Sequence, residues 1–246
     1  MIDIHSHILP GLDDGAPDLK TALKMAGLAV KDGITTIIAT PHCHDTIHNC
    51  RKEEIIAACK RFNRELVNRD VPLAILPGAE IHLTPELLDA FCRDELLTLN
   101  NSGSVILLEL PQRFIAEAVV RVIKELKEKG VQTIIAHPER NLTVQGRPGV
   151  VIELTFSGAM LQITAGSLTG KFGRPVMVLT EKIVRMTDVH FLASDSHSPR
   201  KRPPVMTKAV KKLSSMIGRE RTDEIVFENP KSLLSIIPIA SAAYGS

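Results

Sequence analysis

Short apolar runs alternate with longer amphipathic stretches along most of this chain. The apolar runs are rich in Val, Ile and Leu, which is typical of buried parallel strands. They cover residues 1–5, 34–40, 73–76, 104–110, 131–136, 160–164 and 189–194. Between them, apolar residues recur at helical spacing, which predicts helices over about residues 18–31, 52–69, 85–93, 114–129, 147–156, 175–187 and 204–217. Seven successive β-α units predict an α/β fold whose parallel sheet closes, or nearly closes, into a barrel.

No repeat, low-complexity tract or long linker divides the 246 residues. We therefore expect one domain over residues 1–240 and a frayed tail over residues 241–246, which are small and polar. The segment from Gly166 to Lys171 is similar to a phosphate loop, but its spacing is one residue short and Phe172 stands where Ser or Thr is required. We expect this segment to be an ordinary loop after the sixth strand.

Composition excludes several classes of protein. No apolar run approaches the roughly 18 to 20 residues of a membrane span, and no secretory signal pattern is present, so we expect a cytoplasmic protein. A net charge of +2, a single Tyr and no Trp argue against a nucleic-acid partner. The four cysteines lack Cys-x-x-Cys spacing, and we expect free thiols.

Imidazole and carboxylate side chains follow the predicted strands, at the ends where parallel barrels form their active sites. His5 and His7 end the first strand and project to the same face, because side chains on a strand alternate. Six of the seven strands finish in this way, with His5, His7, His42, Glu80, Glu109, His137, Asp195 and His197. Each residue alone has an ordinary explanation, such as a loop residue or a helix cap. Their regular placement on one rim predicts a metal site.

Glu109 and one further acid, Asp14, need separate comment. Glu109 lies in an apolar run, where a carboxylate is costly to bury unless a metal or a cation pairs with it. Asp14 lies in an Asp-Asp-Gly segment that is either a turn or a source of another ligand. With Asp14 the potential ligands number nine, more than one or two ions normally take, and they comprise five His, two Glu and two Asp. Three divalent ions and four carboxylates would leave a charge of about +2, which would attract an anion such as phosphate.

Other basic and imidazole residues are weaker candidates. We treat His44, His48, His82 and His190 as non-ligands, with His82 the strongest alternative because it follows Glu80 by two. Arg140 follows His137 by three, where its fork of donors could hold phosphate oxygens. Arg202 belongs to a basic run that either binds phosphate or is simply solvated.

These motifs resemble the bacterial manganese-dependent protein-tyrosine phosphatases of the polymerase and histidinol phosphatase (PHP) superfamily. The matching segments are 3–15 (DIHSHILPGLDDG), 39–42 (ATPH), 137–141 (HPERN), 162–168 (QITAGSL), 194–197 (SDSH) and 202–204 (RPP). The resemblance extends from residue 1 to about residue 236 and implies a distorted seven-stranded (β/α)7 barrel, the PHP fold. Ser198 departs from the Asn that relatives often have, and residues 44–51 match no family pattern.

The resemblance also implies roles for the residues at the strand ends. His5, His7, Glu80 and Asp195 would hold a first metal ion; Glu80, Glu109 and His137 a second; and Asp14, His42 and His197 a third. The expected ions are three Mn²⁺, with Fe or Zn possible at some of the positions. Arg140 and Arg202 would bind phosphate. If the reaction uses a general acid, Asp14 and a metal-bound water are the two candidates.

The activity that the resemblance implies is hydrolysis of phosphotyrosine on a protein, namely a bacterial tyrosine kinase that controls capsule or exopolysaccharide synthesis. A cysteine-dependent mechanism is excluded, because no Cys is followed six positions later by Arg. Three alternatives remain open: a small-molecule phosphatase such as one for histidinol phosphate, an amidohydrolase, and a non-catalytic metal-binding module. Amidohydrolases commonly have Lys at the end of the fourth strand, where this chain has Glu109.

Overall fold

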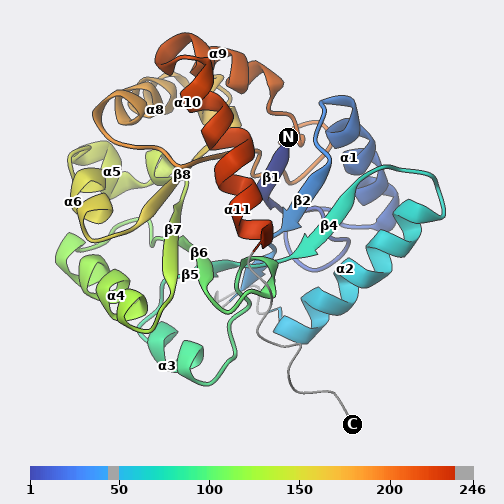
Figure 1. Ribbon diagram of the computed structural model, residues 1–246, viewed down its shortest axis with the longest axis horizontal. Coiled ribbons are helices and arrows are strands. Elements are labelled where there is room, and N and C mark those ends of the chain that lie inside the picture. The colour runs from blue at the N-terminus through green and yellow to red at the C-terminus, as the bar shows by residue number, and fades with distance from the viewer. Residues whose placement is uncertain (44–49, 236–246) are drawn as a thin grey trace.

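All strands in the computed structural model, which describes residues 1–43 and 50–235, pair in parallel (Figure 1). One sheet has the order β1 (Ile2–Ser6), β2 (Thr36–Ala39), β4 (Ala74–Pro77). The other has the order β3 (His42–Cys43), β5 (Glu80–His82), β6 (Val105–Glu109), β7 (Gln132–Ala136), β8 (Met160–Thr164), β9 (Phe191–Ala193). Each of the seven predicted strands overlaps one of these, so the predicted alternation of strands and helices is confirmed.

Two short strands distort the barrel. β3 continues the path of β2 beyond Pro41, and β5 continues that of β4 beyond Gly78. Proline has no N–H for a sheet ladder, and a Cβ at Gly78 would lie 2.7 Å from Ile38 Cγ2, so the chain bends at both places. The second segments begin with His42 and Glu80, which are direct partners in the register of β3 and β5. The breaks therefore set two predicted ligands side by side.

The first and last strands meet at their carboxyl ends. The Asp195 N–H donates to the His5 carbonyl (2.9 Å) and the His7 N–H to the Ser196 carbonyl (2.8 Å). The hydroxyls of Ser6 and Ser196 are 2.7 Å apart. These contacts close the ring of strands and hold the first and last predicted ligand motifs together.

Helices follow most of the strands. The α-helices are α1 (Leu19–Lys31), α2 (Lys52–Val67), α3 (Leu87–Cys92), α4 (Ala116–Glu128), α5 (Leu142–Gly146), α6 (Val150–Phe156), α7 (Ala165–Leu168), α8 (Arg174–Met186), α9 (Thr207–Ile217), α10 (Arg219–Asp223) and α11 (Asn229–Ser235). Short segments of other helix types are η1 (Leu99–Asn101), η2 (Pro138–Arg140) and the π-helical η3 (Glu224–Glu228). At the start of α1 a local interaction fixes where the helix begins, because the Asp18 carboxylate accepts the Thr21 N–H at 2.7 Å and caps the helix. None of the helices in the described residues is long and apolar enough to span a membrane.

Three expectations about helices were wrong, the first at α5, because no helix was expected over residues 142–146. Residues 165–168 form α7 rather than a loop, a single turn too short to show helical periodicity. Helices also cover residues 219–235, where none was expected; this region runs through a π-helical turn, which breaks the regular spacing of its apolar residues. The expected tail, residues 241–246, lies outside the described residues.

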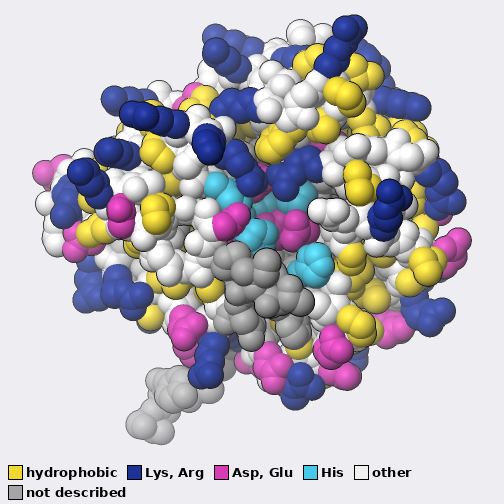
Figure 2. Space-filling model, turned by 180° about the vertical axis from the view of Figure 1, so that it is seen from behind, with side chains coloured by type: hydrophobic (Ala, Val, Ile, Leu, Met, Phe, Trp, Pro, Cys, Tyr) yellow, Lys and Arg dark blue, Asp and Glu magenta, His cyan; other side chains and the backbone are white. Residues whose placement is uncertain are grey.

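The apolar core has two parts. The larger lies between the strands and the surrounding helices. The smaller joins alternate strand residues, among them Ile4, Ile38, Leu107 and Phe191, to Leu233 of α11. In Figure 1, α11 lies across one end of the strands, and the view from behind in Figure 2 shows histidines and acids gathered at the other end. One end of the barrel is thus covered by apolar packing, while the other presents polar chemistry.

The loop after β1 depends on a close approach at Gly15. A Cβ there would lie 2.1 Å from the His7 carbonyl oxygen and 2.5 Å from His7 Cβ. We expect Gly15→Ala to lower the free energy of unfolding by about 1–3 kcal/mol through overpacking. Gly27→Ala in α1 is the matched control, because nothing lies within 4 Å of its added Cβ, and it should raise stability by about 0.5–1 kcal/mol. Denaturant unfolding measures both, and equal stability of Gly15→Ala and wild type would contradict the proposed crowding.

Candidate metal centre

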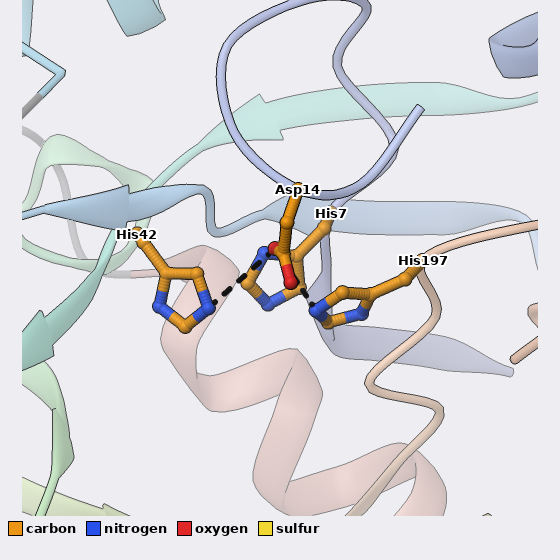
Figure 3. A group of neighbouring side chains, drawn as sticks. All are labelled: His7, Asp14, His42 and His197. Atoms are coloured by element: carbon orange, nitrogen blue, oxygen red, sulfur yellow. Dashed lines mark ion pairs between the residues drawn. The ribbon is translucent and has the colours of Figure 1, made fainter. Parts of the chain in front are cut away.

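The nine predicted ligands all lie at one end of the barrel, in four overlapping groups whose donor atoms fall within 4.8 Å of one another. The groups are His7, Asp14, His42 and His197; His5, His7 and Glu80; His5, His137 and Asp195; and His42, Glu80 and Glu109. Figure 3 shows the first, with Asp14 between His42 and His197. The grouping differs in part from the expected division among three ions. His7 lies with the ligands expected for the third ion, and His137 lies with His5 and Asp195, which were expected at the first. The assignment of each ligand to one ion stays a prediction.

Glu80 is at the centre of the cluster. Its side chain is 1% exposed, and its Oε2 lies 3.2 Å from His5 Nε2, 3.2 Å from His7 Nε2 and 3.3 Å from His42 Nδ1. Its Oε1 lies 2.6 Å from His137 Nε2. Burial acts to raise the pKa of Glu80, but the charges of His5 and His137 outweigh it and hold the pKa well below its usual value. Glu80 is therefore ionised, and both of its oxygens face imidazole nitrogens with which they could share a metal ion.

Two acceptors outside the predicted set orient the first two histidines. His5 Nδ1 lies 2.8 Å from Gln162 Oε1, and His7 Nδ1 lies 2.6 Å from Asp13 Oδ2. Because these oxygens only accept, each Nδ1 carries the proton and each Nε2 faces the centre, where the two Nε2 atoms are 3.3 Å apart. Asp13 also accepts the N–H groups of Gly15 and His42. Asp13 belongs to the Asp-Asp-Gly motif and Gln162 to the QITAGSL motif. Nothing in the spacing of these motifs indicated which histidine each residue contacts.

The geometry fits a metal. Two Nε2 atoms and two buried carboxylates converge, and Asp195 Oδ1 has no hydrogen-bond partner among the described residues although it lies 3.4 Å from His5 Nε2 and 3.6 Å from His7 Nε2. In the protein alone, protons supply the missing positive charge. Burial disfavours the charged form of His7, but hydrogen bonds to Asp13 and Glu80 raise its pKa to about 10. Imidazole and carboxylate donors in this arrangement suit a divalent transition metal.

Asp14 lies at the exposed side of the cluster. Its Oδ1 is 3.4 Å from His197 Nε2 and 3.7 Å from His42 Nε2 (Figure 3), and its side chain is 51% exposed. The interaction with His197 holds the pKa of Asp14 well below its usual value. Asp14 is therefore ionised at neutral pH, which suits a metal ligand better than a general acid.

The other histidines occupy different positions. His82 Nδ1 lies 3.3 Å from Glu109 Oε2, beside the centre but in none of the four groups. His190 Nδ1 accepts the Leu161 N–H at 3.3 Å and precedes β9, at the opposite end of that strand from Asp195. His44 and His48 lie outside the described residues, as does most of the segment 44–51.

Arg140 and Arg202 converge on a single oxygen. Arg140 Nη1 and Arg202 Nη2 both donate to Oδ2 of Asp195, the oxygen that faces away from His5. Their side chains are 24% and 27% exposed, and in Figure 2 Lys and Arg side chains border the histidines and acids. Both arginines predicted to meet phosphate are thus beside the donor groups and reachable from solvent.

Buried acids fix the chain on either side of the centre. Asp3 Oδ1 accepts the Ser194 N–H at 2.9 Å, and Glu139 Oε1 accepts the Thr164 N–H at 2.9 Å. Burial raises the pKa of Asp3 to about 6. His137 (φ 32°) and Asp195 (φ 50°) adopt left-handed backbone conformations that are uncommon outside glycine. Such strain persists only where surrounding contacts enforce it, and sequence reasoning identified neither the strain nor these supporting acids.

Known proteins are similar to this chain over almost its whole length. A family model described as capsular polysaccharide synthesis, CpsB/CapC, matches residues 1–235. The tyrosine-protein phosphatase YwqE of Bacillus subtilis is 37% identical over 95% of this chain and 91% of its own length. The tyrosine-protein phosphatase CpsB of Streptococcus agalactiae serotype III is 26% identical over 95% of this chain and 98% of its own.

Solved structures agree. One from a study of YwqE from Bacillus subtilis and CpsB from Streptococcus pneumoniae, described as metal-dependent tyrosine phosphatases, superposes with a TM-score of 0.90 at 37% identity and covers 95% of this chain and 94% of that one. Histidinol phosphate phosphatase from Lactococcus lactis shares the fold alone, with a TM-score of 0.57 at 10% identity over 92% and 96% of the two chains. The chain is therefore a member of the CpsB/CapC family of metal-dependent tyrosine-protein phosphatases, as its motifs predicted.

Proposed function

We propose that this chain hydrolyses phosphotyrosine at the metal centre, with Arg140 and Arg202 binding the phosphate. The observation that supports this is the convergence of both guanidinium groups on Asp195, beside four groups of metal donors. Bound divalent ions would supply an activated water and would neutralise phosphate oxygens. We further propose that these ions are three Mn²⁺, held by His5, His7, Glu80 and Asp195; by Glu80, Glu109 and His137; and by Asp14, His42 and His197.

The arginines would stabilise the charge that develops on phosphorus. Each presents a planar fork of donors that matches two oxygens of a phosphate. Asp195 holds both forks in the resting protein, so an arriving phosphate meets donors already directed to one place. Preorganised donors of this kind avoid reorganisation during the reaction, which is why they accelerate it.

The ionised state of Asp14 supports a phenolic leaving group. A general acid must carry a proton, and the low pKa of Asp14 leaves it without one at neutral pH. Tyrosine leaves with a pKa near 10 and needs less protonation than the alkyl oxygen of serine. The physiological substrate we propose is a bacterial tyrosine kinase that controls capsule or exopolysaccharide synthesis, because the family model is one of capsular polysaccharide synthesis. A kinase takes phosphate from ATP, and we propose that both proteins act in the cytoplasm.

Substrate choice is the first test. Chelator-stripped protein should be inactive, and added Mn²⁺ should restore hydrolysis of a phosphotyrosine peptide in preference to a phosphoserine peptide and histidinol phosphate. Phosphate release from the three substrates at matched concentrations measures this. If histidinol phosphate were the best substrate, the proposed substrate class would be wrong; if metal-loaded protein hydrolysed none of them, catalysis itself would be refuted.

Removing one arginine tests its role in the transition state. Arg140→Ala should lower kcat/KM for the phosphotyrosine peptide by about 10²–10³-fold, or about 2.7 to 4 kcal/mol, as the loss of one preorganised donor does elsewhere. Arg147→Ala is the matched control, because that side chain is 57% exposed and pairs with Glu153. Steady-state kinetics and metal content are measured for both variants. An unchanged rate in Arg140→Ala would remove this residue from the mechanism.

Metal binding should release protons. Below pH 10 His7 is protonated in the metal-free protein, because its pKa is raised to about 10 from 6.5. A ligating Nε2 has to be unprotonated, so Mn²⁺ displaces this proton and apparent affinity rises with pH up to that value. Calorimetric titrations near pH 7 in two buffers with different ionisation enthalpies should give different binding enthalpies. Identical enthalpies in both buffers would show that no proton leaves.

A further inference from the structure

Arg140 and Arg202 are a pair of like charges with one carboxylate between them. Both donate to Asp195 Oδ2, and in residues 1–43 and 50–235 neither guanidinium has a second acid within ion-pair distance. Arg202 Nε is buried and has no hydrogen-bond partner there. Among these residues Asp195 is thus the one acid in ion-pair contact with the two guanidinium groups, which repel each other across it, while Glu80 and Glu139 attract Arg140 from farther away.

Phe172 lies against both guanidinium groups. Its ring centroid is 5.0 Å from the central carbon of Arg140 and 5.7 Å from that of Arg202. The face of an aromatic ring carries partial negative charge and attracts cations within about 6 Å of its centroid. The same ring is thus placed to stabilise both arginines at once.

The backbone fixes the position of this ring independently of the arginines. A Cβ at Gly166 would lie 3.0 Å from Phe172 Cε2, so the ring packs directly on the backbone of α7. The Lys171 N–H donates to the Gly166 carbonyl at 2.9 Å. Gly170 (φ 85°) and Gly173 (φ 90°) make the turn on either side of Phe172, in conformations that favour glycine. The turn between α7 and α8 therefore holds the ring in place.

We propose that Phe172 is a positioning residue that sets the spacing of Arg140 and Arg202 for one phosphate. The negative face of the ring offsets the repulsion between the guanidinium groups and keeps both beside Asp195 before the substrate arrives. The inference rests on the proposed role of the two arginines in phosphate binding. Phe172 acts through these arginines and touches no reacting atom.

Substitution by Leu and by Tyr separates the ring's charge from its bulk. Phe172→Leu keeps an apolar side chain but has no ring, and it should lower kcat/KM for the phosphotyrosine peptide about tenfold, because two cation–π contacts are lost. Phe172→Tyr keeps the ring and should remain within about twofold of wild type. Phe156→Leu makes the same change on α6, where the side chain is 88% exposed, and should leave the kinetics unchanged.

Fluorinated phenylalanines at position 172 give a sharper test. Each added fluorine withdraws negative charge from the ring face with little change of shape, so the attraction to a cation falls in steps. We expect kcat/KM to fall in the order of fluorination, with unchanged melting temperature and metal content. The affinity of the Mn²⁺-loaded protein for inorganic phosphate, measured by calorimetry, should weaken in the same order.

These measurements distinguish the inference from the proposed function. A flat fluorine series in both assays, or an equal loss in Phe172→Tyr and Phe172→Leu, would overturn the electrostatic role of the ring. If wild type failed to hydrolyse phosphotyrosine while phosphate affinity still followed fluorination, the proposed substrate would be wrong and the role of Phe172 would stand. If the Mn²⁺-loaded wild type bound no phosphate, the positioning role would fall with it.

Discussion

Burial of carboxylates at the strand ends is the constraint on which this structure depends. Glu80 and Asp195 are each 1% exposed, and a buried charge is tolerated only when other charges and hydrogen bonds compensate for it. Here the compensation comes from histidines on four separate segments of the chain, brought together by the barrel. Several of their Nε2 and Nδ1 atoms face the same carboxylate oxygens, and in the protein alone a proton on His7 supplies positive charge where a metal ion would supply more. The fold and the centre are therefore parts of one electrostatic arrangement.

Asp195 connects the metal donors to the arginines because its two oxygens face different groups. Oδ1 is directed to His5 and His7, while Oδ2 accepts from Arg140 and Arg202. A carboxylate shared in this way ties the position of the two arginines to that of the two histidines. Asp195 itself has a left-handed backbone conformation just after β9, and this conformation directs its carboxylate to both groups.

The sequence predicted the seven main strands and the end of the barrel at which the nine ligands gather, because apolar runs mark strands and parallel strands bring their carboxyl ends together. It did not predict that β2 and β4 break and resume as β3 and β5, since such breaks depend on tertiary crowding at Gly78. It singled out Asp14, which lies beside His197, but it gave no role to the adjacent Asp13, which orients His7. The contact of Asp13 depends on the path of the loop, which the sequence does not show.

Chemistry and substrate choice have different physical origins in this barrel. Most of the ligands stand at strand ends, where the hydrogen bonds of the sheet fix the backbone. The positions of the metal donors therefore have little freedom to change. The groups that meet the rest of a substrate come from the segments beyond those ends, among them the turn that carries Phe172 and the loop that carries Arg202. Segments of that kind can change length and side chains without disturbing the ladder. The histidinol phosphate phosphatase shares the fold at 10% identity, so the same framework of strands and helices forms from largely different side chains.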